Sequence, residues 1–139
     1  MAQHQNLEWV LLAGLECSDN AIASWPPMLN LGAVHVSRNR QASEWMRRLC
    51  DLRLPKLVEL SVEDTVVNDS DLEAFLKAYD PVFLHLAGVK TITDEAINTL
   101  AREPRLRRIT TGDSGITPDG VKRLRVGLPN VMVYDNRYE

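Results

Sequence analysis

Residues 57–72 read LVELSVEDTVVNDSDL and residues 81–97 read PVFLHLAGVKTITDEAI, and the second stretch repeats the pattern of the first. Each begins with a short run in which apolar and polar residues alternate, and each continues through a polar turn. An apolar residue, a small polar residue and an aspartate then follow at 67–69 and at 92–94, ahead of a segment with helical spacing. The two stretches are therefore one structural unit that occurs twice.

The same unit recurs along nearly the whole chain. The central apolar residues of the alternating runs follow one another at steps of 24, 26, 24 and 25 residues, and they are Val10, Val34, Leu60, Leu84 and Ile109. A sixth, partial copy occupies residues 129–133. Repetition at a fixed period indicates an architecture in which each unit buries its apolar side against its neighbours.

Each unit combines a strand with a short helix. Alternation at residues 34–36, 60–62 and 84–86 is the period-2 pattern of a strand with one buried face. The segments that follow carry apolar residues at helical spacing, and these are Leu72, Phe75, Leu76, Ile97, Leu100, Val121, Leu124 and Leu128. The chain therefore alternates strand and helix throughout.

Capping residues and prolines mark the ends of the expected helices. The candidates for the N-terminal caps are Asp69 or Ser70, Thr93 or Asp94, and Thr117, which Pro118 follows at a favourable first position. Prolines at 81, 104 and 129 lack the amide that another helical turn would need. We expect each helix to end shortly before its proline.

At these residues the chain resembles the leucine-rich repeat family, and in particular its subgroup with repeats of about 25 residues that read L-x-x-L-x-L-x-x-T-x-I-T-D-x-x-I-x-x-L-x-x-x-P-x. The resemblance spans residues 7–134. It implies an α/β solenoid with short parallel strands on its concave side and short helices on its convex side. We expect a single domain over residues 1–139, with repeats that start near 7, 31, 57, 81 and 106 and a partial last strand at 131–134.

Two segments depart from the family pattern. Residues 38–48 lack the turn made of an apolar residue, threonine and aspartate. Trp25-Pro26-Pro27 leaves the first repeat little room for a helix, because the residue before a proline is driven away from helical dihedral angles. We therefore expect irregular convex segments in the first and second repeats.

The composition favours a cytoplasmic domain without a membrane span. The 139 residues carry a net charge of −3, which gives no overall attraction to nucleic acid, and no stretch approaches the roughly 20 apolar residues that cross a bilayer. Nothing basic precedes the apolar run at residues 9–13, so a strand explains it better than a signal peptide. Cys17 and Cys50 are expected to be buried reduced thiols, with a redox pair as the alternative.

Charge is distributed unevenly along the chain. Residues 59–80 hold seven acids and one lysine, whereas residues 102–139 hold eight basic residues and five acids. These blocks are either solvated faces with favourable charges near helix ends or a polarised surface that steers a charged partner. Under the second interpretation the acidic block would attract a basic protein.

If the strands line one side of a curved stack, their outward residues form columns at strand spacing. One column is Trp9, Ala33, Glu59, Phe83 and Arg108, the next is Leu11, His35, Ser61, His85 and Thr110, and a third is Ala13, Ser37, Glu63, Ala87 and Gly112. Phe83 is the most informative of them, since a large apolar side chain in the middle of an exposed sheet face usually contacts a partner. The predicted contact residues are Trp9, Leu11, His35, Glu59, Ser61, Glu63, Phe83, His85, Arg108 and Thr110.

The same columns give little support to catalysis or metal binding. His35 and His85 lie two strands apart, about 9.6 Å, which is too far for both to bind one zinc ion without distortion. Adjacent strands allow a contact between Ser61 and His85, but no acid in their column would orient the imidazole. The aspartates at the helix starts supply too few oxygens for calcium and are expected to cap helices. We expect no catalytic residue, no metal and no cofactor.

The favoured function is a non-enzymatic protein-binding module that uses a few anchor residues of the concave face inside a polar rim. The resemblance implies that such stacks serve as adaptors, inhibitors or recognition subunits, and a small one could act as an antidote to a toxin. The alternative is a structural subunit. The first strand, residues 9–12, has only a short segment before it, and an uncovered edge strand tends to pair with a second copy or another protein.

Overall fold

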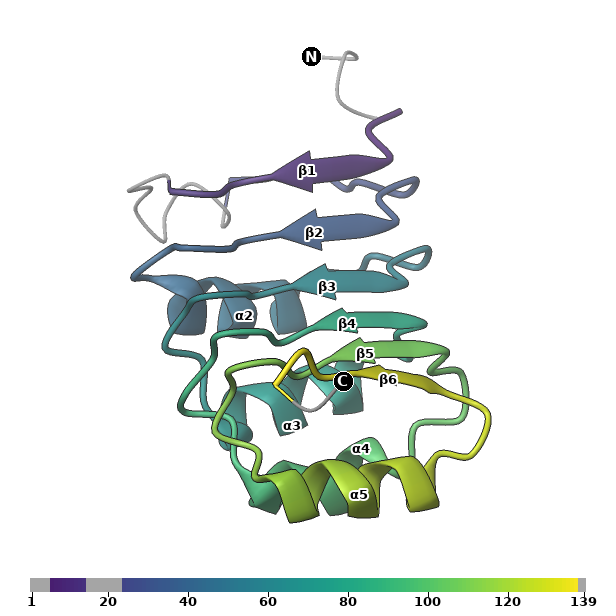
Figure 1. Cartoon of the computed structure of the whole chain (residues 1–139). Coiled ribbons are helices and arrows are strands. Elements are labelled where there is room, and N and C mark those ends of the chain that lie inside the picture. Colours follow the sequence, from purple (N-terminus) through teal and green to yellow (C-terminus); the bar gives the residue numbers. More distant parts are fainter. Residues whose placement is uncertain (1–5, 15–23, 138–139) are drawn as a thin grey trace.

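Six short strands form one parallel sheet in the computed structural model, which describes residues 6–14 and 24–137 (Figure 1). The strands lie in the order of the sequence, so each inner strand pairs with the one before it and the one after it. Their bounds are Trp9–Leu11 (β1), Ala33–His35 (β2), Glu59–Ser61 (β3), Phe83–His85 (β4), Arg108–Thr110 (β5) and Met132–Tyr134 (β6). From β2 onward helices alternate with these strands, which confirms the α/β class.

The register of the sheet matches the register predicted from the repeat. The central residues of successive strands pair directly, in the order Val10, Val34, Leu60, Leu84, Ile109 and Val133. Those from Val34 to Ile109 have no exposed surface, because alternate residues of a strand point to the same side of the sheet. The two flanking columns also line up as predicted and continue to Met132 and Tyr134.

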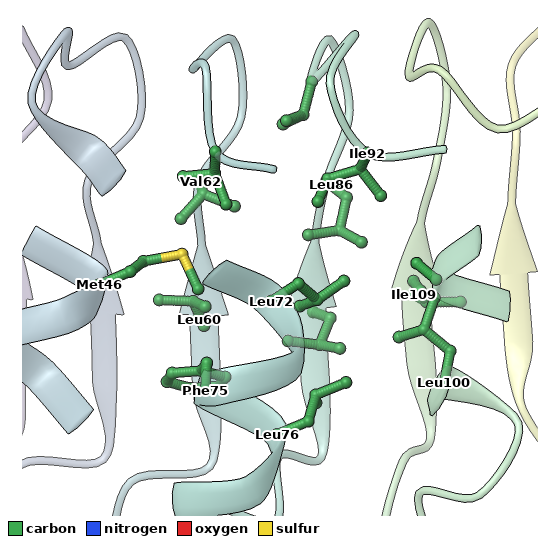
Figure 2. Close-up of a cluster of buried hydrophobic side chains, with 14 of the residues drawn as sticks. Met46, Leu60, Val62, Leu72, Phe75, Leu76, Leu86, Ile92, Leu100 and Ile109 are labelled. Carbon is green, nitrogen blue, oxygen red and sulfur yellow. The ribbon is translucent and has the colours of Figure 1, made fainter. Parts of the chain in front are cut away.

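The helices lie on one side of the sheet (Figure 1). α2 spans Ala42–Asp51, α3 spans Asp69–Ala78 and α5 spans Pro118–Gly127, whereas the 3-10 turn η1 (Asp94–Ala96) leads into the short helix α4 (Ile97–Leu100). The apolar residues expected at helical spacing are buried, and Figure 2 shows side chains from helices and strands filling one layer between them. None of the described helices is both long and apolar enough to cross a membrane.

The second repeat contains a regular helix, so the prediction of an irregular segment over residues 38–48 is wrong. α2 buries Ala42, Trp45, Met46 and Leu49, which follow the spacing of one helical face. The residue at its N-terminal cap position makes no side-chain capping bond. Tertiary burial of the apolar face therefore stabilises a helix for which the sequence supplies no start signal. The corresponding segment of the first repeat, residues 15–23, lies outside the described residues, as does Cys17.

A residue with positive φ follows each strand from β1 to β5. These residues are Gly14, Arg38, Asp64, Gly88 and Asp113, with φ between 55° and 76°, and they recur at the same steps of 24, 26, 24 and 25 residues as the strand centres. Of the two glycines in this set, Gly14 has open space around it, whereas a Cβ added at Gly88 would lie 2.0 Å from the Asp64 Oδ1. The repetition thus extends from the apolar pattern to the backbone conformation.

Side-chain caps start the helices of the third, fourth and fifth repeats. Asn68 accepts from the Asp71 amide at 3.0 Å while Asp71 accepts from the Asn68 amide at 3.3 Å, which is a capping box. Thr93 and Thr117 cap the next two helices as expected, and Pro118 occupies the first position of α5. The cap of α3 therefore lies one residue earlier than the sequence suggested.

Asp69 and Asp94 join neighbouring repeats and do not cap their own helices, contrary to expectation. Asp69 accepts from the amide and the hydroxyl of Thr93 at 2.8 and 2.7 Å, and Asp94 accepts from the same groups of Thr117 at the same distances. Partial desolvation alone would raise the pKa of Asp94, but the hydrogen bonds from Thr117 and Arg123 outweigh it and lower the pKa. Stacking brings successive helix starts together, and this contact is not visible within a single repeat.

Candidate protein-binding face

The outward residues of the six strands form one surface, here called the strand face. It consists of two columns, which are Trp9, Ala33, Glu59, Phe83, Arg108 and Met132, and Leu11, His35, Ser61, His85, Thr110 and Tyr134. Nine of the ten predicted contact residues belong to these columns, and Glu63 lies just beyond the end of β3, half-buried. Met132 and Tyr134 were missed, although extending the columns into the partial sixth repeat would have found them.

The two ends of the strand face expose large apolar side chains. Trp9 and Leu11 on β1 are 60% and 52% exposed, and Met132 and Tyr134 on β6 are 49% and 44% exposed. Phe83, which the sequence indicated as the most informative contact residue, is partly buried. The apolar surface that a partner could cover therefore lies mainly at the ends of the strand face.

Glu59 lies between two histidines at the centre of the strand face. Its Oε1 is 2.9 Å from His35 Nε2 and 3.4 Å from His85 Nε2. All three side chains are between 22% and 32% exposed, and the two imidazole centroids are 6.3 Å apart. A neutral histidine can donate an N–H to the carboxylate, and a protonated one pairs with it as an ion. The Glu59 carboxylate thus contacts both histidines while its side chain remains partly exposed.

This His35–Glu59–His85 cluster corrects two expectations. The strand spacing placed the histidines about 9.6 Å apart, but the side chains lean together until the ring centroids are 6.3 Å apart. Their own column contains no acid, whereas Glu59 reaches both rings diagonally from the neighbouring column of the intervening strand. Within residues 6–14 and 24–137, no group of three or more His, Cys, Asp or Glu side chains is arranged to hold a metal ion.

Ser61 is not accessible to a partner, although it is one of the predicted contact residues. It is 3% exposed, and its hydroxyl shares a hydrogen bond of 2.9 Å with the Ser37 hydroxyl. In the sheet register it lies between His35 and His85 on the neighbouring strands. In the described structure no hydrogen bond joins Ser61 to either imidazole, so the pair of nucleophile and base that the spacing allowed does not form.

Arg108 lies between two aromatic rings near the C-terminal end of the strand face. Its guanidinium carbon is 5.8 Å from the centroid of the Phe83 ring and 5.8 Å from that of the Tyr134 ring, within the range of cation–π attraction. Its Nε is buried without a hydrogen-bond partner, as is the hydroxyl of Thr110 on the same strand. No carboxylate in the described part of the chain forms an ion pair with this arginine.

Cys50 carries a free, half-buried thiol in α2, away from the strand face. Burial, together with the negative charges of Asp51 and Asp71, raises the pKa of this thiol. The thiolate is the form that attacks substrates and binds metals, so Cys50 is poorly suited to either role at neutral pH.

The chain matches no protein-family model, and no curated protein resembles it significantly in sequence. What the strand face can bind therefore follows from its own geometry. It offers two exposed apolar ends, a central carboxylate held by histidines, and an arginine stacked between two rings.

Proposed function

We propose that the chain is a solenoid of the leucine-rich repeat type and acts as a non-enzymatic protein-binding module through its strand face. The coincidence of three features supports the repeat assignment: the apolar period, the strand register and the recurring residue with positive φ. In such a stack the outward side chains of successive strands lie side by side. Residues from all six strands can then contact one partner.

The observation that carries this proposal is the location of the exposed apolar side chains. Seven large ones are exposed among the described residues, and four of them belong to the strand face. These four are Trp9, Leu11, Met132 and Tyr134. Aromatic residues, methionine and arginine are the types enriched at protein interfaces, and the strand face combines them around a polar centre.

The polar centre of the strand face favours binding over catalysis. A catalytic nucleophile or base must reach a substrate, but Ser61 is covered and Glu59 is engaged by both histidines. Such a centre can instead accept complementary polar groups from a partner while the apolar ends supply most of the binding free energy.

The test compares the proteins captured by the wild-type chain and by two variants. The M132S/Y134S variant removes apolar surface from the strand face, whereas V126S removes an even more exposed apolar side chain from α5. Each chain is immobilised and exposed to an extract of the native host, and captured proteins are identified by mass spectrometry. We expect a specific partner with the wild type and V126S and its loss with M132S/Y134S. A partner retained by all three, and by W9S/L11S as well, would exclude this face.

A second candidate function is assembly through the N-terminal edge of the sheet. In the described part of the chain, β1 has no strand on its outer side, and residues 6–11 line a shallow depression there. At the opposite edge, Arg125 donates to the Val133 carbonyl of β6 at 3.1 Å. An edge strand with exposed apolar residues is readily extended by another strand.

Size-exclusion chromatography with light scattering tests this alternative. If β1 is the contact, the wild type and M132S/Y134S should both form a dimer or larger species, and W9S/L11S should be monomeric. A wild-type chain that stays monomeric at high concentration would reject assembly through copies of itself and leave the strand-face proposal standing.

A further inference from the structure

The strand face contains a single cation, and that cation has no anionic partner within the described residues. Arg108 is contacted by the rings of Phe83 and Tyr134, which neutralise none of its charge. Glu59, the carboxylate in the same column, contacts His35 and His85 instead. The positive charge at this end of the strand face is therefore open to pairing with an anion from outside the chain.

The surroundings of Arg108 hold its side chain ready for such a pairing. The two rings come from the neighbouring strands β4 and β6, so the guanidinium is restrained from both sides. Its Nε is covered, which leaves the terminal nitrogens as the donors that a ligand can use. A planar guanidinium with paired N–H donors matches a carboxylate, and a restrained side chain loses little conformational entropy on binding.

The residues next to Arg108 define what must accompany the carboxylate. Met132 pairs with Arg108 in the sheet register, and Tyr134 lies two residues further along β6. Both are about half exposed. An apolar side chain of a partner placed on them would exclude water from the ion pair and strengthen it, because electrostatic attraction increases as the local dielectric constant falls.

The acidic side of the strand face does not offer an equivalent site for a basic partner. Glu59 is shared by two histidines, and Glu63 is half-buried beyond the end of β3. The acidic block at residues 59–80 favoured a basic partner in the sequence, but the side-chain contacts make negative charge the better complement.

We propose that the strand face binds a protein segment that places an aspartate or glutamate carboxylate on Arg108 and an adjacent apolar side chain on Met132 and Tyr134. This inference rests on the proposed function, since it names the chemistry of the partner for the same surface. It differs from the sequence-based expectation of a basic partner in the sign of the charge that is recognised.

Selection from a library of random short peptides displayed on phage tests the proposal without a known partner. The full chain is immobilised, and the bound phage are sequenced. We expect enrichment of peptides in which an acidic residue stands next to an apolar or aromatic one. Selected peptides in which acidic residues are no more frequent than in the starting library would overturn the inference.

Binding measurements on a selected peptide then identify the residue responsible. Fluorescence anisotropy of the labelled peptide compares the wild type, R108Q and the control R105Q, which removes an exposed arginine outside the strand face. Loss of a hydrogen-bonded charge pair should weaken binding by R108Q at least about tenfold, and R105Q should bind as the wild type does. Replacing the acidic residue of the peptide by its amide should weaken wild-type binding and leave R108Q binding unchanged. Equal affinity of R108Q and the wild type would overturn the proposal.

The same selection separates failure of this inference from failure of the proposed function. Peptides that bind the wild type, bind R108Q equally and are lost with W9S would show that the strand face binds protein segments by another rule. That result would overturn the acidic-segment proposal and keep the proposed function. Peptides that bind every strand-face variant equally would reject both.

Discussion

Residues on neighbouring strands have opposite roles because alternate residues of a strand point to opposite sides of the sheet. Leu84 at the centre of β4 points into the core and has no exposed surface, whereas Thr110 on β5 faces outward with a hydroxyl that is covered and unpaired. The first side chain holds neighbouring repeats together by apolar contact, and the second contributes no hydrogen bond. Their contributions to stability should therefore differ strongly.

Replacing these two residues by alanine measures that difference. Leu84→Ala should lower the free energy of unfolding by about 2–5 kcal/mol, because it leaves a cavity in a fully buried position. Thr110→Ala should change it by less than about 0.5 kcal/mol, because its hydroxyl has no hydrogen bond to lose. Urea unfolding followed by circular dichroism gives both values. Similar losses for the two variants would contradict the strand register.

Tyr79 links α3 to the end of α2, because its single hydroxyl proton is shared between the carbonyls of Leu49 and Leu52, the latter at 2.7 Å. Burial, aided by charge on Cys50 and Asp51, raises the pKa of this phenol to about 12. Tyr79→Phe should lower the free energy of unfolding by about 1 kcal/mol at neutral pH.

The pH dependence of the Tyr79→Phe effect follows from the direction of the pKa shift. The phenol ionises more readily in the unfolded chain, whose tyrosine pKa is about 10. Its stabilising contribution is therefore complete below about pH 10 and is lost as the pH rises toward about 12. Urea unfolding at several pH values should show the wild type losing its advantage over the variant in that window. A constant difference across it would refute the linkage.

At the level of elements, aspartates connect the start of one helix to the start of the next. Asp69 ties α3 to the capping threonine of η1, and Asp94 ties η1 to the capping threonine of α5. A threonine held in this way is already oriented to accept from its own helix. Cap formation in one repeat therefore depends on the repeat before it, which makes the stack more cooperative than separate helices would be.

Two aspartate variants test this connection between helices. Asp69→Ala should lower the free energy of unfolding by about 2 kcal/mol, since two hydrogen bonds to a charged group are lost. Asp119 lies one residue further from its cap, Thr117, is exposed and pairs with Lys122, so Asp119→Ala should cost less than about 0.5 kcal/mol. Denaturant unfolding measures the free energy of unfolding of both variants. Equal decreases would mean that the carboxylates act only within their own helices.

At the level of the whole molecule, the two ends of the sheet are built differently. At the C-terminal end, Asp135 is fully buried and accepts from Arg137 and Thr111, while Arg137 also donates to three backbone carbonyls of the fifth repeat. At the N-terminal end, β1 exposes Trp9 and Leu11. The contacts of Asp135 and Arg137 tie the segment after β6 to the fifth repeat.

The burial of Asp135 and its hydrogen bonds should make the free energy of unfolding depend on pH below neutrality. The hydrogen bond from the Arg137 side chain, outweighing desolvation, holds the pKa of Asp135 below its usual value of 3.8. A carboxylate with a lowered pKa stabilises the fold above the unfolded-state pKa and loses that contribution as the pH falls through the folded-state value. Asp135→Asn should therefore be less stable than the wild type at neutral pH, and urea unfolding should show the two converging below about pH 4. A difference in the free energy of unfolding between the two proteins that persists at low pH would contradict this role of Asp135.

Patterns that repeat along the chain were sufficient to predict how the strands are arranged in the sheet. The strand order, the register from Val10 to Ile109 and the two outward columns follow from a period of 2 within strands and a constant step between them. The helix of the second repeat was not predicted, because no capping residue marks its start as one does in the later repeats. Its apolar face includes Trp45 and Met46.

The partners of the polar side chains were decided only by the tertiary structure. Glu59 leans across to two histidines, Asp69 reaches the next repeat, and Arg108 is enclosed by rings from both neighbouring strands. Each contact joins neighbouring repeats and depends on which way a flexible side chain leans. Apolar burial is a property of one face and leaves a periodic trace in the sequence, whereas a polar pair needs a particular geometry between two side chains and leaves none.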